Sequence, residues 1–202
     1  MVRGLKSDEV LMLQLRIALR GIEPPIWRRV LVPDHLQLAQ LHRVLQGAMG
    51  WTNSHLHEFE IGGLSYGPMD PEARAMGYPA FDEKHVRLWN FKRQPGITFT
   101  YTYDLGDNWE HDVEIEEFVA VADDIEPKVL AGERNCPPED VGGVDGYMSF
   151  VEAVLDPSHE EHEAMLTWAG GRFDPEEFDL AAANEAVSRA VRSARPRKRR
   201  QT

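Results

Sequence analysis

The chain has 202 residues, of which 42% are hydrophobic and 28% charged, a balance typical of one globular domain and unlike that of disordered or membrane-embedded chains. No apolar run approaches the ~20 residues of a membrane-spanning helix, and the N-terminus has no apolar signal core, so we expect no membrane partner and no export. The formal net charge of −12 disfavours nucleic acid as a ligand of the folded body, because phosphate backbones are bound by Lys and Arg.

The first fifty residues predict a hairpin followed by a helix. Period-two alternation predicts a strand over residues 11–19, with the apolar side chains Leu11, Leu13, Leu15, Ile17 and Leu19 on one face. A turn at Glu23-Pro24-Pro25 leads to a second strand, residues 26–32, that can pair back antiparallel. Apolar residues at helical spacing then predict a helix from Leu38 that ends at Gly50 and carries His42 on its apolar stripe.

The central segments carry most of the histidines. Residues 55–61 alternate again, and His55 and His57 share the apolar side of this predicted strand. Residues 67–84, rich in Gly, Pro and acids, predict a long irregular surface connection of the kind that often borders a functional site. Residues 97–103 and 109–115 then predict a β-hairpin around the turn Asp104-Leu105-Gly106-Asp107, with His111 on its buried side.

The last third is predicted to be helical. An apolar stripe over residues 147–155 ends at Asp156-Pro157, Ser158 can cap a second helix that runs toward Trp168, and Asp179 can cap a third. We therefore expect an α+β fold, with a mainly antiparallel sheet built from the N-terminal and central hairpins, packed against helices. The predicted boundaries are a disordered N-terminus over 1–10, one domain over 11–191 and a basic disordered tail over 192–202.

Imidazole and carboxylate side chains gather at the predicted strands and turn. His55, His57, His111 and Asp107 are candidate ligands of a divalent metal ion, because two histidines at alternate strand positions project together. The alternative interpretation is structural. Half-buried histidines commonly bond to a backbone carbonyl, and Asp104 and Asp107 suit a turn in which Gly106 supplies a positive φ.

A second constellation is the loop Cys136-Pro137-Pro138-Glu139-Asp140-Val141-Gly142-Gly143. It can present Glu139 or Asp140 to a cation or a substrate proton, or it can be a tight turn that caps the next helix. The candidate catalytic set is then His111, Asp104, Asp107, Glu139 and Asp140. Cys136 is the single cysteine, which excludes an internal disulfide and favours the cytoplasm; we expect it to be a buried or free thiol, not a nucleophile.

The charge of the chain is unevenly distributed. Six of its cations, Arg192, Arg195, Arg197, Lys198, Arg199 and Arg200, follow residue 191, so the remaining residues carry −18. The basic tail is therefore a candidate contact for nucleic acid or an acidic partner, or a solubilising end.

The segment from His159 to Glu163 lacks the spacing of a helical zinc motif, which needs histidines four residues apart. It predicts a solvated acidic helix.

Five segments in order carry a resemblance to a known family. They are Ile26-Trp27-Arg28-Arg29-Val30, Leu41-His42 in a helix that ends at Gly50-Trp51, His55-Leu56-His57-Glu58-Phe59, the run from Tyr103 to His111, and the run from Cys136 to Gly143. Together they resemble the plasmid pRiA4b ORF-3-like family over roughly residues 11–190. The resemblance implies an α+β fold but no specific activity. Leu105 stands where the family usually has an aromatic residue, a conservative departure.

Two functions follow as hypotheses. The first is a non-catalytic binding or interaction module associated with plasmids or mobile elements, whose partner is a protein or small molecule. The second is a metal-dependent hydrolase or nuclease in which a divalent metal ion activates water and a carboxylate takes its proton. It requires the candidate imidazoles and carboxylates to converge.

Overall fold

A computed structural model describes residues 10–69, 71, 75, 77, 81–91, 95–122 and 126–193 of the chain. Within these residues an eight-stranded sheet has the order β5-β4-β3-β6-β7-β1-β2-β8. The strands are β1 (Val10–Leu19), β2 (Trp27–Pro33), β3 (His57–Ile61), β4 (Leu64–Gly67), β5 (Phe81–Asp82), β6 (Thr98–Tyr103), β7 (Trp109–Val121) and β8 (Lys128–Glu133). The predicted α+β class is confirmed.

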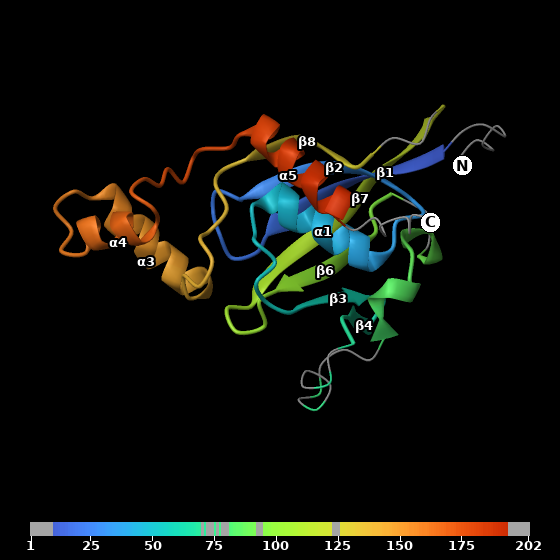
Figure 1. Ribbon diagram of the computed structural model, residues 1–202, viewed down its shortest axis with the longest axis horizontal. Helices are drawn as coiled ribbons and strands as arrows, with labels where there is room; N and C mark the ends of the chain where they lie inside the picture. The colour runs from blue at the N-terminus through green and yellow to red at the C-terminus, as the bar shows by residue number, and fades with distance from the viewer. Residues whose placement is uncertain are drawn as a thin grey trace, which may run out of the picture.

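The described part of the chain has four α-helices, two that cover one face of this sheet and two that lie beyond its end (Figure 1). They are α1 (Leu38–Met49), α3 (Gly143–Leu155), α4 (His162–Trp168) and α5 (Leu180–Ser193), with short 3-10 segments η1 (Glu83–His85) and η2 (Leu88–Asn90). Figure 1 shows α1 and α5 side by side across the sheet, and α3 and α4 projecting past its end. Gly47 permits the close approach of α1 to α5, because a Cβ there would lie 2.8 Å from the backbone nitrogen of Val187.

Both predicted hairpins are confirmed. Strand β1 pairs antiparallel with β2 and also with β7, and β6 pairs antiparallel with β7 so that Tyr101 lies opposite His111. The apolar side of β1 is buried in the core beneath α1, as its alternation predicts. The predicted helix end is also confirmed, since Gly50 closes α1 in the left-handed region with a φ of 115°.

Three short strands depart from the sequence predictions. Strand β4 pairs antiparallel with β3 after the two-residue turn Gly62-Gly63, and β5 pairs parallel with β4. The described ends of the segment 67–84 therefore join the edge of the sheet instead of forming an irregular connection throughout. Residues 70, 72–74, 76 and 78–80 of that segment lie outside the described residues. The third strand, β8, pairs with β2 at the other edge. Each is too short, or too mixed in composition, for a period to be detected.

The predicted helix caps have different outcomes. Asp179 caps α5 as predicted, because its side chain accepts hydrogen bonds from the backbone N–H groups of Ala181 and Ala182. Ser158 does not cap α4. Its backbone N–H and hydroxyl both donate to the Asp156 side chain in a local turn, and α4 begins only at His162. The predicted disordered ends lie largely outside the described residues.

A buried arginine ties the end of α1 to the end of β8. Arg28, on β2, is 2% exposed. Its guanidinium donates to the carbonyls of Ala48 and Met49 at the end of α1, to those of Glu133 and Arg134 at the end of β8, and to that of the residue before it. All of its N–H groups therefore have backbone acceptors, and a single side chain fixes two element ends relative to β2.

No carboxylate neutralises this buried charge among the described contacts. The face of the guanidinium lies over the ring of Phe178, with 4.2 Å between Arg28 Cζ and the ring centre. Burial lowers the pKa of Arg28 to about 10, so the side chain is still charged at neutral pH. The carbonyls at the C-terminal end of α1 carry partial negative charge, which makes them suitable partners for a cation. Arg28 is therefore stabilised by peptide dipoles.

Among the described residues, no helix combines the length and the apolar character needed to cross a membrane.

Replacing Arg28 is predicted to destabilise the fold strongly. Arg28→Met keeps much of the side-chain volume but leaves several buried carbonyls without a donor, so we expect a loss of about 3 kcal/mol or more in the free energy of unfolding. The control is Arg20→Met, because Arg20 pairs with Glu110 and Asp112 at the surface with 41% of its side chain exposed. That change should cost about 1 kcal/mol or less. Urea unfolding measures both, and equal losses would contradict the role given to Arg28.

Candidate functional site

His55 lies in the loop that connects α1 to β3, and this loop is held at several points. The backbone N–H of Asn53 donates to the Gln46 side chain, 2.7 Å away, and that of Ser54 donates to the Tyr103 hydroxyl, 2.9 Å away. Asn53 has a φ of 59°, a left-handed conformation that asparagine tolerates well. The loop thus leaves α1 and turns the His55 ring toward the Asp104 turn.

Asp104 uses its two carboxylate oxygens differently. Its Oδ1 accepts hydrogen bonds from the backbone N–H groups of Gly106 and Asp107, the turn role that the sequence suggests. The predicted positive φ at Gly106 is wrong, because the left-handed residues of this turn are Asp104, with a φ of 54°, and Asn108, with a φ of 55°. Its Oδ2 lies 3.6 Å from His55 Nε2. The residue is buried, with 8% of its surface exposed. Asp104 is therefore both a turn residue and a neighbour of the imidazole.

Glu139 and Asp140 approach His55 from the Cys136–Gly143 loop. Glu139 Oε1 accepts from the backbone N–H and the hydroxyl of Thr52, and the Tyr103 hydroxyl donates to the same carboxylate at 3.1 Å. Its Oε2 lies 3.9 Å from His55 Nε2. Asp140 is closer, with Oδ1 at 3.1 Å from the same nitrogen, and 71% of its side chain is exposed. Glu139 is thus held by its neighbours, whereas Asp140 faces solvent.

Asp107 joins the two loops. Its carboxylate accepts a hydrogen bond from the backbone N–H of Gly142 at 3.0 Å. Gly143 lies so close that a Cβ at that position would be 2.7 Å from the Asp107 carbonyl oxygen, and its φ is 69°. Only glycine fits such an approach without displacement. The Asp104 turn and the Cys136–Gly143 loop therefore form one continuous surface around His55.

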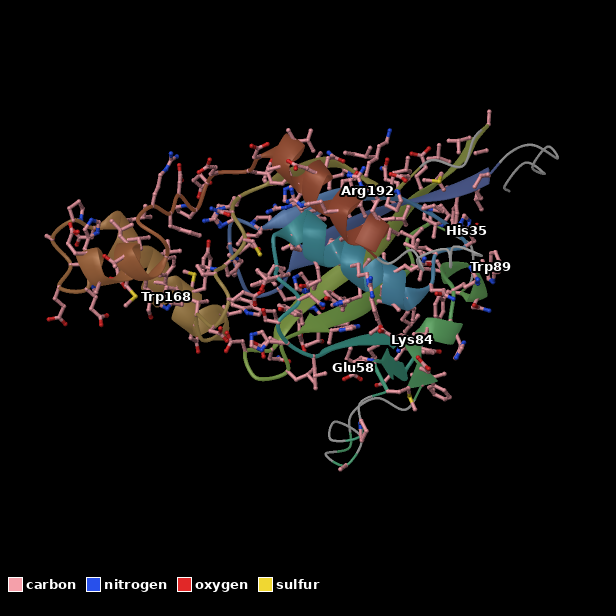
Figure 2. The ribbon with its side chains drawn as sticks, viewed as in Figure 1. His35, Glu58, Lys84, Trp89, Trp168 and Arg192 are labelled. Atoms are coloured by element: carbon pink, nitrogen blue, oxygen red, sulfur yellow. The ribbon has the colours of Figure 1, made fainter. Side chains whose placement is uncertain are left out.

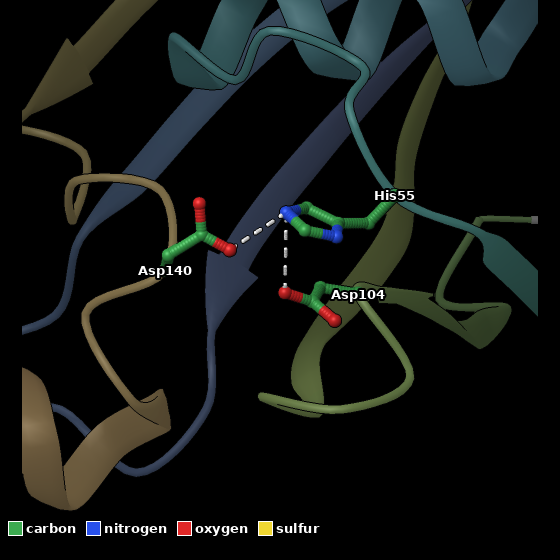
Figure 3. Close-up of side chains that lie close together, drawn as sticks. All are labelled: His55, Asp104 and Asp140. Carbon is green, nitrogen blue, oxygen red and sulfur yellow. Dashed lines mark ion pairs between the residues drawn. The ribbon is translucent and has the colours of Figure 1, made fainter.

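The His55 ring nitrogen is surrounded by carboxylates without being hydrogen-bonded to them. Nε2 is buried and has no partner of hydrogen-bonding geometry among the described residues, although Asp104 and Asp140 flank it (Figure 3). Ligand atoms of these three residues lie within 4.8 Å of one another. Ligands held at ~2.0–2.3 Å from a metal ion are about 3–4 Å apart, and imidazole with carboxylate suits zinc, iron or manganese. The donor set therefore fits a divalent cation after a small contraction.

His57 and His111 are not part of this group. His57 Nε2 lies 2.7 Å from a carboxylate oxygen of the buried Glu83, and its ring stacks on that of His42 with 3.5 Å between ring centres. His111 is fully buried, and its Nδ1 lies 3.1 Å from the Tyr101 carbonyl oxygen. The predicted ligand set of His55, His57, His111 and Asp107 thus does not surround one point, because the last three side chains have partners elsewhere.

Burial determines the protonation of several side chains near the site. It lowers the pKa of His111 to about 4 and that of His42 to about 3, where the neighbouring His57 adds to the effect. Burial also raises the pKa of the Cys136 thiol, which is buried as expected and is thus a poor nucleophile at neutral pH. The remaining candidates for chemistry are His55 and its carboxylates.

Some residues that position the candidate side chains were not among the predicted site residues. Thr52 and Tyr103 position Glu139, and Glu83 binds His57. Tyr103 had a usable signal, because strand alternation places it on the buried side directly before Asp104. Glu83 had none, since it follows a two-residue strand within a segment without periodicity.

Comparisons with known proteins identify a family and two similar proteins. The family model described as plasmid pRiA4b ORF-3-like protein matches residues 11–182. The chain is 42% identical over 172 residues to the uncharacterized protein y4hQ of Sinorhizobium fredii, a match that covers 85% of each chain. It is also similar to the crystal structure of MM3350, a protein of unknown function from Methanosarcina mazei Go1. That match has a TM-score of 0.76 and 36% identity, and it covers 86% of this chain and 96% of that one.

The contact between the loops can be tested at Gly143. Gly143→Ala is expected to lower the free energy of unfolding by about 1–2 kcal/mol for the left-handed backbone and by about 1–3 kcal/mol more for the clash with Asp107. Gly62→Ala is the matched control, because Gly62 has a φ of 61° but nothing within 4 Å of a Cβ. Urea unfolding measures both variants. A loss at Gly143 no greater than that at Gly62 would show that the loops do not need this contact.

The free energy of unfolding is predicted to decrease as the pH falls, because His111 is buried in its neutral form. In the unfolded chain its imidazole takes up a proton near pH 6.5, whereas in the folded protein its pKa is about 4. The unfolded state binds more protons in this window, so the stabilisation is complete above pH 6.5 and is lost as the pH falls toward 4. His111→Gln should make this decline shallower by up to about 1 kcal/mol per pH unit.

The measurement is urea unfolding at several pH values within that window. The control is His85→Gln, since 84% of the His85 side chain is exposed, and its slope should match that of the parent protein. An unchanged slope in His111→Gln would mean that His111 is not kept neutral by burial.

Proposed function

The chain belongs to the plasmid pRiA4b ORF-3-like family, and we propose that it is a non-catalytic binding module, associated with plasmids or mobile elements, that holds a divalent metal ion. The ligands are His55 Nε2, Asp104 Oδ2 and Asp140 Oδ1, with Glu139 as a further carboxylate at the edge of the site. When bound, the metal ion neutralises carboxylates that now crowd one imidazole nitrogen.

The observation that carries this proposal is the environment of His55 Nε2. The nitrogen is buried, three carboxylate oxygens lie between 3.1 and 3.9 Å from it, and none accepts a hydrogen bond of good geometry from it. An imidazole N–H would normally donate a hydrogen bond to one such oxygen, whereas a metal ion can be coordinated by the nitrogen and several carboxylate oxygens at once. The strongly acidic body of the chain also attracts cations.

Binding is favoured over catalysis because the side chains best suited to proton transfer already have other partners. His57 is paired with Glu83, His111 is fully buried, and Asp107 accepts a hydrogen bond from Gly142. The site that remains has a single imidazole. Asp104 and Asp140 are themselves proposed ligands, and the remaining carboxylate, Glu139, accepts hydrogen bonds from Thr52 and Tyr103, so no free general base lies beside the proposed metal.

A metal-dependent hydrolase is the second candidate, and one observation favours it. Asp140 is largely exposed and also lines a cavity, so water and a small substrate can reach this ligand of the proposed metal. In that function Asp140 or Glu139 would take the proton of the water. The acidic surface disfavours polyanionic substrates such as nucleic acids.

Metal binding is tested by calorimetric titration of chelator-treated protein with Mn²⁺ and with Zn²⁺. We expect one saturable site, and we expect His55→Asn and Asp104→Asn each to weaken binding by tenfold or more; Asn at position 104 keeps an oxygen for the turn. The control is His85→Asn, because His85 forms a surface pair with Asp82 at 3.7 Å and should be dispensable. Binding that is unaffected by His55→Asn would refute the proposed site.

The two functions are separated by turnover. The metal-loaded protein is incubated with a chromogenic phosphodiester and with a chromogenic carboxylic ester, and product is followed by absorbance. The binding module predicts no turnover above that of His55→Asn. Metal-dependent turnover that Asp140→Asn abolishes would instead establish the hydrolase.

A further inference from the structure

A cavity lies next to the candidate cation site, between the Cys136–Gly143 loop and the projecting helices α3 and α4. It measures about 270 Å³. Its principal lining residues are Asp140, Val141, Phe150, Glu161, Met165 and Trp168. The cavity therefore combines apolar walls with carboxylates, and it shares only Asp140 with the ligands proposed for the metal.

An aromatic side chain forms one wall of the cavity. Trp168 packs against the buried Phe150 in a T-shaped arrangement, with 5.7 Å between ring centres and 70° between ring planes. This contact fixes the indole, yet 49% of Trp168 is exposed. Figure 2 shows Trp168 on the part of the molecule that projects beyond the sheet. A rigid indole with exposed surface is suited to stacking against a planar group.

The charged groups of the cavity are acidic. Asp140 has 71% of its side chain exposed, and Glu161 is exposed as well. Among the described residues, the carboxylate of Glu161 has neither a hydrogen bond nor an ion pair. The cavity thus places available negative charge beside an aromatic surface, a combination that favours a cation with an apolar stem and repels phosphate or carboxylate ligands.

We propose that this cavity binds an arginine side chain of a partner protein. A guanidinium is planar and stacks on an indole, its N–H groups pair with carboxylates, and its aliphatic stem packs against apolar side chains such as Val141 and Met165. A lysine ammonium has no such plane and is more strongly hydrated, so it fits less well. This inference goes beyond metal binding and does not need it, because Glu161 and Trp168 are not metal ligands.

The probe is an acetylated and amidated glycine–arginine–glycine tripeptide, compared with the same peptide carrying citrulline. Citrulline has nearly the shape of arginine but no charge. Binding to the full chain, with chelator present, is followed by the ¹⁵N shift of the Trp168 indole N–H, which is assigned from its absence in Trp168→Phe. We expect saturable binding of the arginine peptide, with citrulline at least tenfold weaker. Equal affinities, or no binding of either peptide, would overturn the proposal.

Variants show whether the peptide occupies this cavity. Glu161→Gln removes charge, and Trp168→Leu removes the aromatic face while leaving an apolar side chain against Phe150, so folding is retained. Each is expected to weaken the binding of the arginine peptide at least fivefold. For Trp168→Leu, which lacks the indole N–H, the affinity is measured by calorimetry. Glu163→Gln is the matched control, since Glu163 is an exposed residue of α4 that does not line the cavity. Loss of affinity in the control equal to that in Glu161→Gln would reject a specific contact.

Discussion

The buried guanidinium of Arg28 is the interaction on which the site depends. It binds carbonyls at the ends of α1 and β8, and the loops that carry His55 and Asp140 leave the fold directly after these two ends. One side chain therefore sets where both loops begin. Lysine could not replace it. The five N–H donors of a guanidinium are spread over a plane and reach carbonyls on both sides, whereas the three donors of lysine all lie on one nitrogen. The cost of burying the charge is offset by peptide dipoles, including those at the end of α1.

Beyond these two loop starts, the site is completed by carboxylates that hold the fold together through hydrogen bonds and also place an oxygen near His55. Asp104 closes its turn through Oδ1, and Glu139 binds Thr52 through Oε1. Their second oxygens remain near the imidazole. The structural and the functional interpretations of these residues are therefore compatible. A carboxylate fixed by backbone donors is also preorganised as a ligand, because its position does not depend on the ion.

The sequence predicts the regular elements better than it predicts the convergence of side chains. Strand β1 and the β6–β7 hairpin were predictable, because one buried face imposes a period of two over many residues. It was not predictable that His55 and His57 would lie in different environments. Alternation places them on one face, but β3 begins only at His57, so His55 belongs to a loop whose direction is set by contacts with α1 and Tyr103. The partner of His57, Glu83, is reached only through tertiary structure.

Asp140 connects the two proposed ligands. Its Oδ1 is the carboxylate oxygen nearest to His55 Nε2, and the residue also lines the cavity beside Trp168. A metal ion and a guanidinium are both cations, so each reduces the negative charge available to the other at this residue. Thermodynamic linkage makes the effect reciprocal: the factor by which the metal weakens arginine binding equals the factor by which arginine weakens metal binding. Glu161 and Trp168 lie outside the metal site, so this competition is partial, and the cavity keeps part of its affinity when the metal is bound.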